Sequence, residues 1–472
     1  MRLTRKQLVA GSAGAIALAG AGVYELVDRL TSAPRRRAVR ISRTEQHAID
    51  GLEVVLDNGV EVIVPPLHHE VVTATLRVEE SKPALAEAQR ALEEALDRLD
   101  ERFEPTPRGL SVMLAWGLPY FRRYVPGPAA SRLPLDVRAS KAAGRDVGAV
   151  IDAIPFPSDP DGLVLEDNDV AFFLRGDSLE RIAEGSRGIF EDLDGLFELT
   201  SIRRGFVGGG FAGGASLPKR MAVAAGIAGA ELIPDTAELF LGFTSTQKAG
   251  LGPPAIANFE TLPDYTDQWP DGYFRGGTAM HLSHIFEDIE AWYLNFDFAE
   301  RVATTFRPGL DVSHGTQTVP QASEDAAGVQ GVLRDARRHG AVGHSAAIQS
   351  ASRLPKDVRG NDGTLYPKGT AVPHRADFNT LDNPFLWTSR PERDGASDEP
   401  AAGVHFVVFT PTSDDFHRGR LAMDGVLPGG KTVGIHPRSR MQGLNSVLET
   451  THRQNFLVPP RRHRSFPLAE LR

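Results

Sequence analysis

The stretch "NDVAFFLRGDSLERIAEGSRGIF", residues 168–190, decides the fold because it joins an apolar run to an amphipathic segment. Asp169–Leu174 is a short run rich in Phe and predicts a buried strand. Asp177–Phe190 has the apolar spacing of a helix, and Leu196–Arg203 predicts a further strand. A strand–helix–strand unit therefore occupies this part of the chain.

The same order occurs upstream. Val71–Val78 predicts a strand, Pro83–Phe103 an amphipathic helix, and Gly109–Leu118 a second strand. A hairpin precedes them at residues 53–64, with Asn-Gly at its turn. Two strand–helix–strand units in succession are the pattern of a ferredoxin-like domain.

The second half of the chain is expected to repeat this domain. Arg275–Met280 predicts a strand and His281–Phe298 a helix, in which Leu282, Ile285, Ile289, Trp292 and Phe296 share one face. After a long polar region, Gly403–Phe409 and Asn455–Pro460 predict two more strands. We therefore expect an α+β fold of the dimeric α+β barrel type. It comprises two ferredoxin-like domains with antiparallel sheets, at residues 41–225 and 226–472.

The composition of the chain excludes several classes of function. The 472 residues carry a formal charge of -9 and no long basic run, which argues against a nucleic-acid partner. The chain contains no cysteine, so disulfides, thiolate metal sites and thiol nucleophiles are excluded. A bound metal would depend on His and carboxylate ligands.

Residues 1–40 are expected to be an export signal and spacer. Thr4–Val9 precedes a mildly apolar segment that ends near Val23, which is shorter than the roughly twenty residues of a membrane span. The pattern resembles a twin-arginine signal, with Lys6 at the place of the second arginine. The alternatives are an uncleaved N-terminal helix and association with a membrane through this segment.

A string of motifs spans nearly the whole chain after this segment. The main ones are "RGLSVMLAWGLPYF" (108–121), "IRRGFVGGG" (202–210), "ELFLGFTST" (238–246), "GAVGHSAAIQSASRL" (340–354), "HRADFN" (374–379) and "NFLVPP" (455–460). In this order they resemble the dye-decolourising peroxidases, a heme family with two ferredoxin-like domains and heme in the second. The resemblance implies heme b, hydrogen peroxide and an organic reductant.

The resemblance also implies site residues. His344 matches the family's proximal iron ligand, although His339 is only five residues away and His344 could instead be a solvated helix residue. Arg375 matches the distal arginine, whose permanent charge would stabilise the departing peroxide oxygen; the alternative is a surface arginine. In this interpretation Gly242 and Phe243 contact the cofactor.

The distal loop departs from the family. Where the family has Gly-x-x-Asp-Gly, this chain has Gly242–Thr246, with Ser245 at the place of the aspartate. A serine hydroxyl forms hydrogen bonds but does not hold a proton reversibly near neutral pH, and loss of an acid–base group costs about 10²- to 10⁴-fold in rate. Asp362 in "GNDGT" is an alternative acid, although Asp-Gly is also an ordinary turn.

Three functions remain open. The first is an exported heme-dependent peroxidase-like oxidoreductase of low activity, which could form a homo-oligomer. The second is a non-catalytic heme binder or carrier, and the third is a heme-free scaffold. A separate metal site at His281, His284 and Asp288 would require these residues to share a helix face.

Overall fold

The computed structural model describes residues 38–39, 44–57, 60–208, 214–243, 256–310, 328–394, 397 and 399–472. The export signal, the Asn-Gly turn and Ser245 lie outside these ranges. Within the described part of the chain, no helix is long and apolar enough to cross a membrane.

The first half forms one four-stranded antiparallel unit. Its elements are β4 (His68–Leu76), α3 (Lys82–Arg102), β5 (Ser111–Gly117), β7 (Val170–Gly176), α7 (Leu179–Phe190) and β8 (Phe197–Phe206). The strands lie in the order β8-β4-β7-β5, and each pair is antiparallel. Helices α3 and α7 cover its outer face, where Leu92 and Ile189 pack with Phe172. This arrangement confirms the ferredoxin-like prediction.

The second half repeats the arrangement. Its strands are β9 (Thr278–Glu287), β12 (His374–Arg375), β13 (Phe378–Thr380), β14 (Gly403–Thr410) and β17 (Leu448–Val458). They lie in the order β17-β9-β14, and β12 and β13 both pair with β14. The Ala376 N–H between them donates to Val407 O, so β12 and β13 are two parts of one strand. The second unit is therefore also ferredoxin-like.

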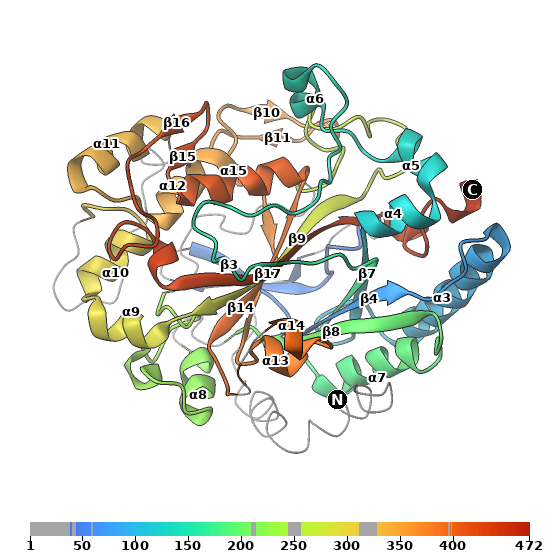
Figure 1. The fold of residues 1–472 in the computed structure, drawn as a ribbon, viewed down its shortest axis with the longest axis horizontal. Helices are drawn as coiled ribbons and strands as arrows, with labels where there is room; N and C mark the ends of the chain where they lie inside the picture. Colours follow the sequence, from blue (N-terminus) through green and yellow to red (C-terminus); the bar gives the residue numbers. More distant parts are fainter. Residues whose placement is uncertain are drawn as a thin grey trace.

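The two units close into a barrel (Figure 1). On one side β17 pairs with β5 through Phe456 and Leu457, and on the other β13 pairs with β8 through Asn379 and Phe206. Apolar side chains from both units fill the interior: Val71, Met113, Ala115, Ala171, Phe173, Met280, Leu282, Ala376, Phe378, Val407, Phe409, Phe456 and Val458. The expected α+β barrel of antiparallel strands is confirmed, while the domain boundary near residue 225 stays a prediction.

Helices cover the outer face of the second unit. They are α9 (Ile289–Asn295), α10 (Phe298–Thr305), α11 (Val329–His339), α12 (His344–Ser352) and α15 (Ser413–Met423). Helices α12 and α15 lie side by side in Figure 1, and Ala346 and Ala347 of α12 share an apolar cluster with Ala422 of α15. The outer face of the second sheet is thus enclosed by helices that follow the strands in sequence.

Smaller elements complete the described chain. They are β1 (Ala38–Val39), β2 (Leu52–Asp57), β3 (Val60–Val64), α4 (Leu118–Tyr124), α5 (Pro126–Arg132), α6 (Val137–Ala143), β6 (Val164–Leu165), α8 (Leu217–Ala224), β10 (Val358–Arg359), β11 (Leu365–Tyr366), α13 (Pro384–Trp387), α14 (Pro391–Asp394), β15 (Val426–Leu427) and β16 (Lys431–Thr432). Strands β2 and β3 pair antiparallel, with Asp57 opposite Val60. The hairpin predicted from Asn-Gly is therefore confirmed.

The predicted helix at His281–Phe298 is wrong over its first part. Strand β9 continues to Glu287, and α9 begins at Ile289 after Asp288, whose side chain accepts a hydrogen bond from Ala291 N–H. The strand lies between β14 and β17 and is buried on both faces over most of its length. A strand buried on both faces shows no polar–apolar alternation, so its apolar residues fall at helical spacing by chance.

Candidate functional site

His344 is the first residue of α12 and lies against the end of α10. The Ala346 N–H donates to Phe306 O, which fixes the start of α12 there. Gly343 makes this approach possible, because a Cβ at that position would lie 2.4 Å from Phe306 O. The backbone contact therefore positions the His344 side chain.

The His344 imidazole is held neutral. Burial, together with the positive charges of Arg375 and Arg420, lowers its pKa to about 3. Its Nδ1 is buried and has no hydrogen-bond partner among the residues that the structure describes. A neutral imidazole with an unpartnered nitrogen is the form that binds metal ions. The charge of Arg375, the other predicted site residue, thus acts on the His344 imidazole.

Arg375 faces outward from β12 and forms a bidentate ion pair with Asp377. Its Nε donates to Asp377 Oδ1 at 2.9 Å and its Nη2 to Oδ2 at 2.6 Å. The Arg375 side chain is 33% exposed, the Asp377 side chain is 12% exposed, and the guanidinium lies 6.0 Å from the centre of the Phe406 ring. Asp377 is the largest cause of a raised pKa for Arg375, so the site contains a fixed cation beside a carboxylate.

Glu287 at the end of β9 is a second carboxyl near this pair. It is 8% exposed, and burial followed by the charge of Asp377 raises its pKa to about 8. Its Oε2 has no hydrogen-bond partner within the described chain. Glu287 is therefore protonated at neutral pH, whereas an ordinary glutamate is ionised.

Aromatic rings fill the neighbouring part of the outer face. The Phe416 ring of α15 stacks on His281 of β9, with centroids 3.5 Å apart and an interplanar angle of 17°. The His281 Nδ1–H donates to Asn455 Oδ1 at 2.7 Å. Because this part is filled, a bound molecule would lie toward His344 and Arg375.

The distal-loop residues that the structure describes approach the same end of α10. Gly242 has a φ of 88°, and a Cβ there would lie 2.5 Å from the Tyr293 hydroxyl. The Phe243 ring packs edge-on against Phe306, with centroids 5.1 Å apart. Phe306 also accepts the hydrogen bond that fixes α12, so Phe243 lies on the same side of the molecule as His344. Ser245 lies beyond the described residues.

Two alternatives from the sequence are not supported by the structure. His281 faces the outer side of β9, whereas His284 faces the barrel interior, 5.0 Å from the His405 ring. Within the described ranges, no group of three His or carboxylate residues could hold a metal ion, so the His281–His284–Asp288 site is wrong. Asp362 accepts hydrogen bonds from Thr364 in an exposed hairpin, as an ordinary turn residue does.

Sequence reasoning missed Asp377, Glu287 and Arg420. The signal for Asp377 was present in "HRADFN", because residues two apart on a strand share a face. Glu287 carried no local signal, since its burial depends on strand β9, where the sequence predicted a helix.

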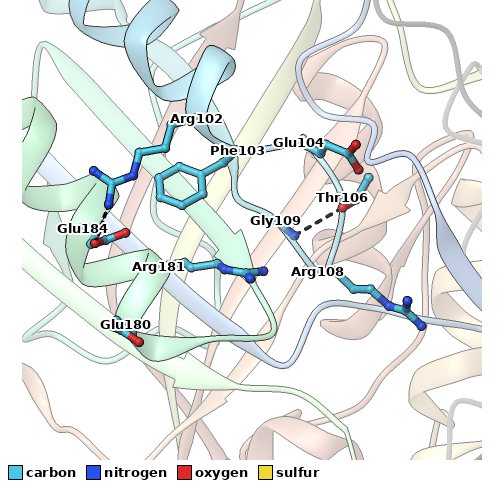
Figure 2. Close-up of a pocket in the computed structure, with 9 residues that line it drawn as sticks. All are labelled: Arg102, Phe103, Glu104, Thr106, Arg108, Gly109, Glu180, Arg181 and Glu184. Carbon is cyan, nitrogen blue, oxygen red and sulfur yellow. Dashed lines mark hydrogen bonds and ion pairs between the residues drawn. The ribbon is translucent and has the colours of Figure 1, made fainter.

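A cavity of about 470 Å³ lies elsewhere, between the end of α3 and α7 in the first half (Figure 2). Its walls mix basic and acidic side chains, including Arg102, Arg108, Arg181 and Glu184. Arg102 pairs with Glu184 at 2.7 Å. This cavity shares no residue with the His344 site.

The closed double ferredoxin-like barrel is the fold of the DyP-type peroxidases. The crystal structure of a DyP-type peroxidase from Cellulomonas bogoriensis matches with a TM-score of 0.51 and 17% identity, over 89% of this chain and 94% of that chain. The encapsulated DyP-type peroxidase from Mycobacterium smegmatis matches with a TM-score of 0.48 and 14% identity, over 87% and 96%. DyPB from Rhodococcus jostii RHA1 matches with a TM-score of 0.48 and 13% identity, over 86% of this chain and 95% of that chain.

The chain belongs to the family DUF7405, described as a family of unknown function, whose model matches residues 66–460. No curated protein matches the chain in sequence. The comparisons therefore establish the family and the fold, and the function is argued from the site.

Proposed function

We propose that this protein is a heme-dependent, peroxidase-like oxidoreductase that reduces hydrogen peroxide with an organic electron donor. One observation carries the proposal. His344 at the start of α12 is half-buried and its imidazole is neutral, and the charge of Arg375 on β12 contributes to lowering its pKa. These are the two positions that the resemblance to dye-decolourising peroxidases implies.

The residues at this site fit heme b. The unpartnered nitrogen of His344 is suited to an iron ligand, and Arg375 supplies a cation that does not titrate. Phe243 and Phe406 add apolar surface near these two residues. We propose that His344 holds the iron and that Arg375, Gly242 and Phe243 line the cofactor.

In the reduction of hydrogen peroxide, the heme and the residues of the chain would have different roles. A bound heme supplies the redox chemistry, exchanging electrons with peroxide and with the reductant. Arg375 stabilises negative charge on the departing peroxide oxygen. Ser245 donates or accepts a hydrogen bond but holds no proton, so on its own it supports only slow turnover.

The test is heme binding by the purified protein. Wild type mixed with hemin should show a Soret band, and His344→Ala should bind heme at least about tenfold more weakly. His339→Ala is the matched control, because His339 lies five residues away and is exposed at the end of α11. Absence of a Soret band in wild type would refute both heme functions. Normal heme content in His344→Ala would refute the ligand assignment.

A non-catalytic heme binder is the second candidate, favoured by the serine at position 245. Stopped-flow mixing of the heme-loaded protein with hydrogen peroxide separates the two. A peroxidase changes its spectrum and returns to the ferric form when a reductant is added. A carrier keeps its ferric spectrum.

We also propose that the protein is exported through its N-terminal segment. The support is the sequence pattern of Thr4–Val9 and the apolar residues after it. Replacement of Arg5 and Lys6 by Gln should retain the protein in the cytoplasm, as measured by cell fractionation. The same fractions, followed by size exclusion, would report membrane attachment and homo-oligomer formation.

A further inference from the structure

We infer that Asp377 is the acid–base residue of this site, the group that moves a proton between the two oxygens of hydrogen peroxide. The inference rests on the proposed function and deepens it, because the distal loop offers only Ser245 for this role. It assigns the role to a strand residue outside the distal loop.

The register of β12 and β13 places Asp377 at the site. Arg375 lies opposite Val408 on β14, whereas Ala376 and Phe378 face the barrel interior. Alternation along a strand therefore puts Asp377 on the same outer face as Arg375. The strand holds both side chains, so their relative position does not depend on a loop.

The contact between the two side chains puts the carboxylate where peroxide would be polarised. Two hydrogen bonds of 2.9 and 2.6 Å join the guanidinium of Arg375 to the Asp377 oxygens. A small molecule held by the remaining N–H groups of Arg375 therefore lies within one side-chain length of a carboxylate. A general base must be within hydrogen-bond reach of the proton it takes, and the pairing keeps the Asp377 carboxylate beside the guanidinium that would hold the peroxide.

The groups around Asp377 also suit proton transfer. Arg375 lies beside it on the same strand, Glu287 interacts with it from β9, and Phe406 of β14 adds an uncharged ring. His344 of α12 and Arg420 of α15 are the further titratable groups of the site. Burial and the charge of Asp377 raise the pKa of Glu287 to about 8, so a carboxyl that keeps its proton at neutral pH interacts with Asp377.

The step balances without consuming Asp377. The carboxylate accepts a proton from the near peroxide oxygen and returns it to the far oxygen, which leaves as water when the O–O bond breaks. Over a full cycle the organic reductant supplies two electrons and two protons, and one hydrogen peroxide yields two molecules of water. The residue ends the cycle in the protonation state in which it began.

The first measurement uses heme-free protein and tests the arrangement of the carboxyl groups. Infrared titration follows the protonated carboxyl of Glu287, which Glu287→Gln assigns by removing its band. In Asp377→Asn the titration midpoint of Glu287 should fall by roughly one pH unit, because a neighbouring negative charge is lost. An unchanged midpoint would overturn the inference, since the two groups would then not share a site.

The second measurement uses heme-loaded protein and stopped-flow mixing with peroxide. Asp377→Asn should react about 10²- to 10⁴-fold more slowly than wild type and lose the acidic limb of the pH–rate profile. Asp377→Glu should keep that limb at a shifted pH. Glu70→Gln is the matched control, because Glu70 also pairs with an arginine, Arg204 at 2.6 Å, but lies in the first half. It should react like wild type.

The outcomes separate the two proposals. Wild type that binds no heme or does not react with peroxide refutes the proposed function, and the infrared result then still reports whether Asp377 and Glu287 interact. Reactive wild type with an equally reactive Asp377→Asn overturns the role of Asp377 alone. If Asp377→Asn takes up no heme, Asp377→Glu decides the question. A shifted acidic limb supports the role, and an unshifted one overturns it.

Discussion

Replacement of Glu287 by glutamine should make the heme-free protein less sensitive to alkaline pH. Glu287 has a pKa of about 8 in the folded protein, against an ordinary value of 4.5. Between these values the unfolded chain releases a proton that the folded chain keeps. Ionisation therefore favours the unfolded state, and stability falls as pH rises. This sign is opposite to that of a carboxylate paired with a cation.

The magnitude follows from the two pKa values. At pH 5 Glu287 is protonated in the folded chain but already mostly ionised in the unfolded chain, and the difference in free energy is below about 1 kcal/mol. At pH 8 the shift from 4.5 to about 8 costs the folded state about 4 kcal/mol at 1.36 kcal/mol per unit. Glutamine does not titrate, so Glu287→Gln should gain about 3 kcal/mol relative to wild type between pH 5 and pH 8.

Urea unfolding followed by tryptophan fluorescence at pH 5, 6, 7 and 8 measures this difference. The control is Glu198→Gln, whose side chain is 54% exposed in a surface pair with Arg77. Its stability should follow the wild-type curve, since exposed pairs contribute about 0–1 kcal/mol. Parallel curves for Glu287→Gln and wild type would refute the reasoning and show that Glu287 is ionised in the folded protein.

Three further predictions concern the site and the barrel. Gly343→Ala should destabilise the protein by about 1–3 kcal/mol in urea unfolding, because its Cβ would lie 2.4 Å from a backbone oxygen, whereas Gly434→Ala meets no atom within 4 Å and should be neutral. Phe378→Ala should cost about 3–5 kcal/mol in the same assay, since this ring is 1% exposed in the barrel interior; a cost near zero would contradict that packing. Adding Ser245→Asp to heme-loaded Asp377→Asn should restore at least about tenfold in peroxide reaction rate, and no gain would argue against Ser245 as a distal-loop residue.

Local patterns predicted much of the fold. The helix at Asp177–Phe190 corresponds to α7, and the strand at Asp169–Leu174 corresponds to β7. Short connections and clear periodicity made these assignments possible. The closure of the barrel left no such signal, because Asn379 and Phe206 are far apart in sequence and their pairing depends on the whole second unit.

The site was predictable in part. His344 and Arg375 followed from the resemblance, and the charge of Arg375 acts on the pKa of His344 in the structure, although their roles stay predictions. Asp377 was missed because its partnership with Arg375 requires the strand register of β12 and β13. Glu287 was missed because the sequence around it predicted a helix, and only the strand carries its side chain to the outer face.

The position of β17 has a consequence for biosynthesis. Residues 448–458 are made after every other barrel strand, yet β17 lies between β9 and β5 and joins the two units. The four strands of the first unit can pair while the ribosome is still translating the second. The barrel, by contrast, stays open until β17 has left the ribosome. A nonsense mutation before residue 448 would therefore release an unclosed chain with exposed strand edges.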